Sequence, residues 1–100
     1  MIQNYILQSL IVQFKTIPHY WTSGNTAEVD FLIQLNNEII PVEVKSDENV
    51  RSKSLAVYQS AFKPKLRIRY SLKNLQHRDG LLNIPLFLSD YTNDFIQLTN

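Results

Sequence analysis

The spacing of hydrophobic residues changes from one segment of the chain to the next. Between residues 2 and 15 they recur at three- and four-residue steps, which predicts an amphipathic helix that ends before Pro18. Residues 27–35 and 39–46 instead alternate, with one wholly apolar face each, as half-buried strands do. A short strand and a turn are expected between the helix and these strands, at residues 19–21 and 22–25.

The second half of the chain predicts fewer elements. The pattern from 50 to 62 fits a second helix that Pro64 would stop, and residues 65–70 alternate as a strand. Residues 84–88 indicate a further short strand, while the last residues show no clear pattern. The expected order is helix, three strands, helix, and one or two strands. This order predicts an α/β fold with a mixed sheet flanked by helices, in a single domain over residues 1–100.

Four charged residues should meet across the central hairpin. If residues 36–37 form its turn, Asp30 lies opposite Glu43 and Glu28 lies opposite Lys45. Directly opposed side chains have Cβ atoms roughly 4.5–5.5 Å apart, and like charges at that distance destabilise a sheet. The two carboxylates therefore predict a cation between them.

Two interpretations of this cluster remain open. In the first, Asp30, Glu43 and the backbone carbonyl of Val44 hold Mg²⁺ or Mn²⁺, Lys45 orients or deprotonates an attacking water, and Glu28 supports the site or a second metal. In the second, Glu28 and Lys45 form a plain cross-strand salt bridge, and the two remaining carboxylates are solvated.

Positive charge is concentrated in the second half of the chain. Residues 49–78 contain no acidic residue. They contain eight of the ten basic residues of the chain, namely Arg51, Lys53, Lys63, Lys65, Arg67, Arg69, Lys73 and Arg78. A basic stretch beside an acidic site suits a protein that handles phosphodiesters, although a solvated surface has the same composition. The candidates for contact with nucleic acid are Arg51, Lys53, Lys65, Arg67 and Arg69.

The charged cluster also resembles a known signature. Asp30 followed by Glu43-Val44-Lys45 resembles the PD-(D/E)xK motif of nucleases. The longer segments WTSGNTAEVDFLIQ, IIPVEVKS, NVRSKSLAVYQSAFKPKLRIRYSLKN and IPLF are similar to the C-terminal domain of a group of bacterial and archaeal AAA-type ATPases, over roughly Tyr5 to Leu88. The resemblance implies a restriction-endonuclease-like core, with the order helix-strand-strand-strand-helix-strand. It also implies a Mg²⁺-dependent nuclease or a nuclease-derived DNA-binding domain.

Two departures from that pattern favour a different function. The first helix of such nucleases often supplies a metal-binding Glu, and the matching position here is Gln3. No glycine-rich phosphate loop is present, because the only glycines are Gly24 and Gly80. The alternative is therefore a non-catalytic domain that keeps the nuclease fold and binds DNA, an ATPase module or another protein.

Composition limits the remaining possibilities. Without cysteine, any metal site must use mainly oxygen ligands, since only two histidines could add nitrogen. The N-terminal segment lacks the basic start and cleavage pattern of a signal peptide, and no stretch has the length of a membrane span. The sequence thus predicts a cytoplasmic protein with no membrane partner.

Overall fold

The computed structural model describes residues 2–23, 27–45 and 53–99 of the chain, without the side chains of residues 2, 20–23, 27–28 and 53–54. Its elements are α1 (Ile2–Phe14), β1 (His19–Ser23), β2 (Ala27–Leu35), β3 (Glu38–Val44), α2 (Lys53–Phe62), β4 (Arg67–Ser71), β5 (Gln76–Arg78), β6 (Leu81–Pro85), the 3₁₀ helix η1 (Leu86–Tyr91) and α3 (Thr92–Leu98).

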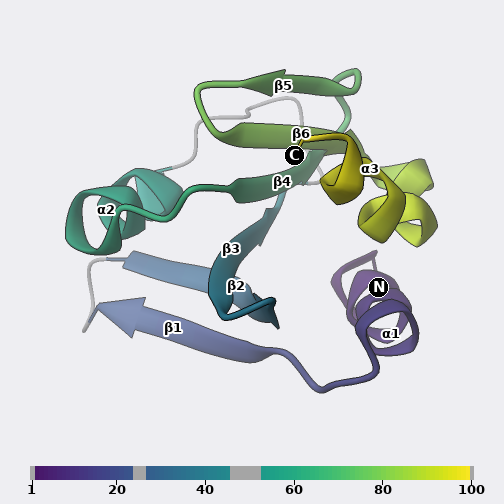
Figure 1. Ribbon diagram of the computed structural model, residues 1–100, viewed down its shortest axis with the longest axis horizontal. Coiled ribbons are helices and arrows are strands. Elements are labelled where there is room, and N and C mark those ends of the chain that lie inside the picture. The colour runs from purple at the N-terminus through teal and green to yellow at the C-terminus, as the bar shows by residue number, and fades with distance from the viewer. Residues whose placement is uncertain (1, 24–26, 46–52, 100) are drawn as a thin grey trace.

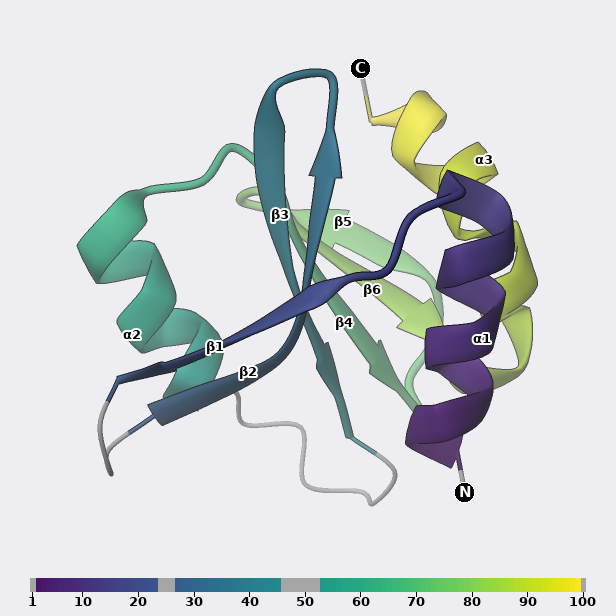
Figure 2. The same cartoon turned by 90° about the horizontal axis from the view of Figure 1, so that it is seen from below.

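The strands form one mixed sheet in the order β1-β2-β3-β4-β6-β5 (Figure 1). The pairs β1–β2, β2–β3 and β5–β6 are antiparallel, whereas β3–β4 and β4–β6 are parallel. Figure 2 shows α2 on one side of the sheet and α1 with α3 on the other. The predicted α/β fold with a mixed sheet and flanking helices is confirmed.

The central hairpin has the predicted register. Leu35 pairs with Glu38, and the ladder continues to Phe31 opposite Val42. Asn36 and Asn37 both have positive φ, at 51° and 66°, as the two central residues of a type I′ hairpin turn require. Asparagine tolerates that conformation better than most residues, so the turn chemistry and the register agree.

The main core lies between the sheet and α1 with α3. It is built from one side of the strands together with the inner face of α1, and its buried members include Ile6, Leu10, Phe31, Ile33, Ile40, Val42, Ile68, Tyr70, Leu82, Ile84 and Ile96. A second, smaller cluster lies under α2 and contains Val29, Leu55 and Tyr58. Because β3 is covered on both sides, Pro41 and Glu43 are buried as well as the apolar residues Ile40 and Val42.

One feature of β2 was not predicted by strict alternation. Val29 was expected to share a face with Phe31 and Ile33, yet it packs in the cluster under α2. Along β1 the pairing advances two residues, from His19 to Trp21, while along β2 it advances three, from Leu32 to Val29. The extra residue in β2 forms a bulge, and a bulge shifts which side chains face each side of the sheet.

The end of the chain also differs from expectation. The strand predicted at 84–88 is instead β6, which stops at Pro85, and η1 follows it. Proline has no backbone N–H for a ladder, which suits the last position of a strand. The elements β5 and α3 were not predicted. The second helix is described from Lys53 onward, and its predicted start at residue 50 lies outside the described residues. None of the described helices is both long and apolar enough to cross a lipid bilayer.

Candidate functional site

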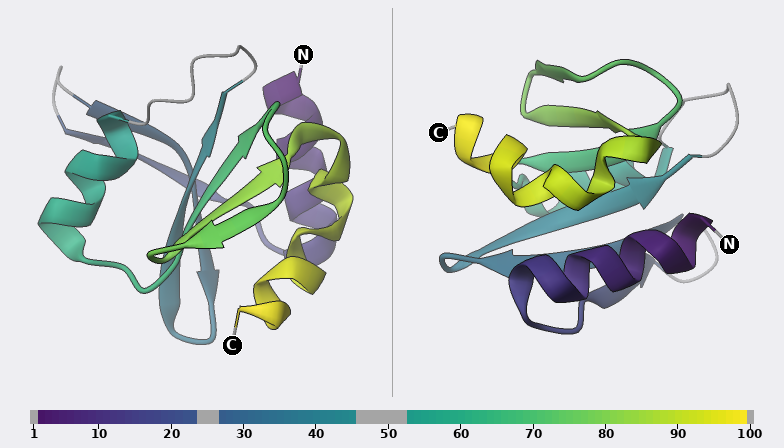
Figure 3. Two further views of the ribbon diagram at one scale, coloured as in Figure 1. Left: turned by 90° about the horizontal axis from the view of Figure 1, so that it is seen from above. Right: turned by 90° about the vertical axis from the view of Figure 1, so that its right-hand side faces the viewer.

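Asp30 is anchored where β2 and β3 separate. Its Oδ1 accepts a hydrogen bond from the Gln3 side-chain amide at 2.6 Å, and its Oδ2 accepts one from the Val44 backbone N–H at 2.8 Å. The paired part of the β2–β3 ladder ends at Phe31 and Val42, so the carboxylate takes over a backbone donor of β3. The N-terminus of α1 lies beside the end of β3 in the right-hand view of Figure 3. The three segments that carry Gln3, Asp30 and Val44 therefore converge at one point.

Glu43 precedes Val44 and is almost fully buried, at 4% exposure. Its Oε1 lies 3.4 Å from Nζ of Lys45, whose side chain remains about one-third exposed. The backbone N–H of Lys45 donates to the carbonyl of Tyr70 on β4, which fixes the position of the lysine at the end of the sheet. Lys45 is thus paired with Glu43, and Asp30 contacts the backbone of Val44 between them. The β2–β3 pairing ends at Phe31 and Val42, so the predicted pair of Asp30 with Glu43 is not part of the ladder.

Arg69 lies beside Glu43 on the neighbouring parallel strand. Partial burial lowers the pKa of the Arg69 guanidinium, the Glu43 carboxylate opposes that shift, and Arg67 adds to it. Nε of Arg69 donates to Oδ1 of Asn83 at 3.0 Å. A buried carboxylate and a partly buried guanidinium therefore share one face of the sheet.

Asn83 is a site residue that the sequence pattern did not single out. It is 3% exposed, and its Oδ1 also accepts from Ser71 Oγ at 2.7 Å. Its Nδ2 donates to the carbonyls of Lys73 and Asn74, at 3.2 and 3.0 Å. This side chain fastens the β4–β5 connection to the sheet and holds Arg69 in place. The polar residue inside the apolar segment 81–85 was the available signal.

The predicted nucleic-acid contacts are not all brought together. Arg67 and Arg69 lie on β4 near Glu43, but Lys65 precedes the strand and pairs with Glu38 at 3.1 Å. Glu38 begins β3, so Lys65 lies at the opposite end of the parallel strands, about 16 Å of strand from Glu43. Arg51 and the side chain of Lys53 lie outside the described part of the chain. The side chain of Glu28 does as well, so its predicted pairing with Lys45 stays a prediction.

The three groups predicted to hold a metal are oxygen donors, the kind that a hard cation prefers. Asp30 and Glu43 supply carboxylates and Val44 a backbone carbonyl, and Mg²⁺ commonly uses one or two carboxylates plus water and substrate oxygens. Within the described ranges, no group of three or more His, Cys, Asp or Glu side chains is placed to hold a metal. Gln3, at the position where the resemblance to nucleases implies a metal-binding Glu, hydrogen-bonds Asp30 through its amide.

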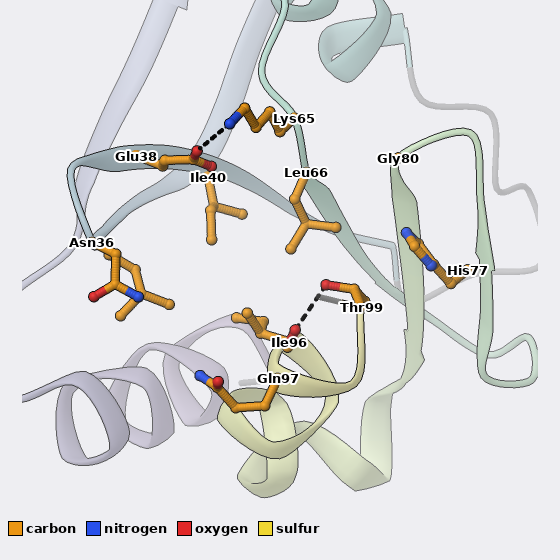
Figure 4. Close-up of a pocket in the computed structure, with 11 residues that line it drawn as sticks. Asn36, Glu38, Ile40, Lys65, Leu66, His77, Gly80, Ile96, Gln97 and Thr99 are labelled. Carbon is orange, nitrogen blue, oxygen red and sulfur yellow. Dashed lines mark hydrogen bonds and ion pairs between the residues drawn. The ribbon is translucent and has the colours of Figure 1, made fainter.

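A separate cavity of about 470 Å³ opens at the other end of the sheet (Figure 4). Ile40, Leu66 and Ile96 form its apolar floor, while His77 and the Glu38–Lys65 pair lie at its rim. The hairpin turn and the end of α3 complete its lining. The cavity is remote from Asp30 and Glu43, so it is not part of the predicted site.

Comparison with known proteins adds one finding. No curated protein and no solved structure matches the chain. A family described as a domain of unknown function, DUF4143, matches residues 1–88, which contain every residue of the site described above. The chain therefore belongs to the DUF4143 family.

Proposed function

We propose that this domain is a Mg²⁺-dependent nuclease acting on DNA, related to or detached from the C-terminal domain of an AAA-type ATPase. The observation that carries the proposal is the arrangement at the end of β3, where Asp30 is anchored on Val44 beside the Glu43–Lys45 pair. In open α/β sheets, ligands commonly bind at the carboxyl ends of the strands, and Glu43 and Lys45 lie at that end of β3. A core of helix, three strands, helix and strand, as found here, is compatible with the restriction-endonuclease fold.

Each residue has a role in this proposal. Asp30, Glu43 and the Val44 carbonyl would hold Mg²⁺ or Mn²⁺, and Glu28 would support them. A bound ion would neutralise charge on the scissile phosphate and lower the pKa of a coordinated water. Lys45 is one-third exposed and fixed through its backbone, so its ammonium would orient the attacking water. The carboxylates would bind the cation, and the lysine would position the nucleophile.

A non-catalytic domain that binds DNA or a protein partner is the second candidate. The observation that favours it is that both carboxylates contact other groups of the protein. The Gln3 amide and the Val44 N–H contact Asp30, and the Lys45 ammonium contacts Glu43. In this alternative the three charged residues serve folding, and an ATPase module or another protein supplies any activity.

Plasmid nicking in Mg²⁺ and in Mn²⁺ distinguishes the two candidates when Lys45→Ala is compared with the wild type. If Lys45 is catalytic, the variant should lose cleavage, while its melting temperature and DNA affinity in Mg²⁺ stay close to those of the wild type. Lys65→Ala is the matched control, because it removes the same charge at the opposite end of the sheet.

The opposite result would support the structural account. A wild type that neither nicks DNA nor gains stability from either metal, together with a Lys45→Ala variant that melts several degrees lower, would refute the nuclease proposal. In that case the lysine acts only as the charge partner of a buried glutamate.

A further inference from the structure

The face of the sheet that carries Glu43 is only partly covered. Helix α2 packs on β2 and β3. Beyond it, Figure 1 shows β4, β6 and β5 lying side by side, and a groove of about 280 Å³ opens over these three strands. Three arginines, Arg67, Arg69 and Arg78, line the groove with Gln76 and Asn83.

The sheet register connects this groove to Glu43. Glu43 pairs with Arg69, Arg69 with Asn83, and Asn83 with Gln76, so the four residues form one row across β3, β4, β6 and β5. Residues in register on adjacent strands share a face, and each strand adds about 4.8 Å. The row therefore extends about 14 Å from the buried carboxylate to the edge of the sheet.

A second row adds two further guanidinium groups. Leu81 pairs with Arg67 on one side and with Arg78 on the other. Leu81 lies two residues before Asn83 on β6, so both rows face the same way. The two arginines thus lie on either side of one leucine, next to the row that begins at Glu43.

Hydrogen bonds within the protein fix the positions of Arg67 and Arg69. Nη2 of Arg67 donates to the carbonyl of Asp79 at 2.6 Å, and the backbone N–H of Arg67 donates to the carbonyl of Gly80 at 2.8 Å. Gly80 has a φ of 79°, and an added Cβ would lie 2.9 Å from the Lys65 carbonyl, so this turn requires glycine. Asn83 fixes Arg69 in the same manner.

The groove carries a net positive charge, although Glu43 lies beside Arg69 and offsets part of it. Asp79 is the one acidic residue of the lining, and it uses its backbone carbonyl, not its carboxylate, to bind Arg67. Nε of Arg67 is buried without a hydrogen-bond partner among the described residues. Guanidinium groups fixed close together in this way match the oxygen atoms of a phosphate, which they bind through paired N–H donors.

We propose that this arginine groove binds a backbone phosphate of a nucleic-acid strand, adjacent to the phosphate that faces Glu43 and Lys45. The inference rests on the proposed function, since it assigns a substrate subsite to the same face of the sheet. The contact is to phosphate because the groove presents no element that enters a DNA groove to read bases.

Fluorescence anisotropy of a short labelled DNA duplex, titrated with protein in EDTA at several salt concentrations, tests the subsite. Arg78→Gln is the informative variant, because Arg78 is exposed and its replacement leaves the buried network around Asn83 intact. Loss of one phosphate contact should weaken binding about tenfold at low salt and reduce the salt slope by about one. Lys65→Gln, which removes the same charge at the far end of the strands, should bind as the wild type does.

The outcomes separate this subsite from the nuclease proposal. Equal weakening by Arg78→Gln and Lys65→Gln would overturn the subsite, because it would show attraction to overall charge only. Undiminished binding by Arg78→Gln, or no binding by the wild type at low salt, would overturn it as well. A selective loss in Arg78→Gln would support the subsite even if the wild type fails to nick plasmid, in which case only the nuclease proposal falls. Circular dichroism of both variants checks that each is folded.

Discussion

The side-chain amide of Gln3 lies 2.6 Å from Oδ1 of Asp30 and joins the first turn of α1 to β2. A neutral amide at this position satisfies the carboxylate without a cation. A second carboxylate there would repel Asp30 unless a metal ion lay between the two, so this contact determines how strongly the site depends on metal.

We expect Gln3→Glu to convert the site into one that is stabilised by divalent metal. In EDTA the variant should unfold more easily than the wild type by about 1 kcal/mol, because a hydrogen bond to a charged group is replaced by repulsion. Millimolar Mn²⁺ should restore its stability and raise its melting temperature more than that of the wild type. Asn4→Glu is the matched control, since it adds the same charge to the same helix end at an exposed position. An identical response of the two variants to Mn²⁺ would contradict a metal site at Asp30.

The second prediction concerns the buried pair Tyr70 and Thr92, whose hydroxyl oxygens are 2.6 Å apart. Thr92 donates its hydrogen to the Ser89 carbonyl, so Tyr70 must be the donor to Thr92. Tyr70→Phe should cost about 1 kcal/mol of unfolding free energy, whereas Thr92→Val should cost about 2–3 kcal/mol because it leaves two buried groups unpaired. Urea unfolding measures both, with the exposed Tyr91→Phe as control. The reverse order of the two costs would show that the hydrogen-bond directions are wrong.

Alkaline pH should lower the unfolding free energy through the same tyrosine, Tyr70. Burial raises the pKa of the Tyr70 hydroxyl above its ordinary value of 10.0. A raised pKa in the folded state means that the stabilisation is complete below pH 10 and is lost as the pH rises further. The unfolding free energy of the wild type should therefore fall more steeply above pH 10 than that of Tyr70→Phe, in matched urea titrations.

The fourth prediction concerns the contact between α1 and η1. Asp90 accepts hydrogen bonds from Ser9 at 2.6 Å and from Tyr5 at 2.7 Å, and these bonds lower the pKa of the carboxyl group below its ordinary value of 3.8. A lowered pKa means that this stabilisation is present above pH 3.8 and is lost as the pH falls through the folded-state value.

Acid titration of wild type and Asp90→Asn checks this contact. The wild type should lose more stability on acidification than the variant over that window, and the two should converge at the acid end. Parallel acid curves would show that Asp90 makes no charge-dependent contribution to holding α1 on η1. Asp94→Asn, at an exposed acid in the next helix, is the control.

Much of the fold followed from local pattern. The first helix and the register of the central hairpin were predictable because burial on one face fixes both period and pairing. That register also brings Asp30 to the backbone of Val44, which lies between Glu43 and Lys45 in the chain. These inferences needed only neighbouring strands.

Other features depend on contacts that no local pattern shows. The bulge in β2 turns Val29 toward α2, and it arises from pairing with β1. The strand β5 has no apolar residue at all, so alternation could not reveal it. The basic residues of 49–78 formed one group in the sequence, yet parallel pairing of β3 with β4 places Lys65 and Arg69 at different parts of the sheet. Arg78 entered the site only through the pairing of β5 with β6.

The outer strand β5 has a further consequence for how the protein behaves at high concentration. An outer strand offers unpaired backbone groups on which another chain can add a strand, the usual start of aggregation. Here that strand is three residues long, Gln76–Arg78, and every residue in it is exposed and polar. A short edge of this kind, with a charge at its end, resists such addition. The strand that completes the arginine groove should thus also help to keep concentrated samples dispersed.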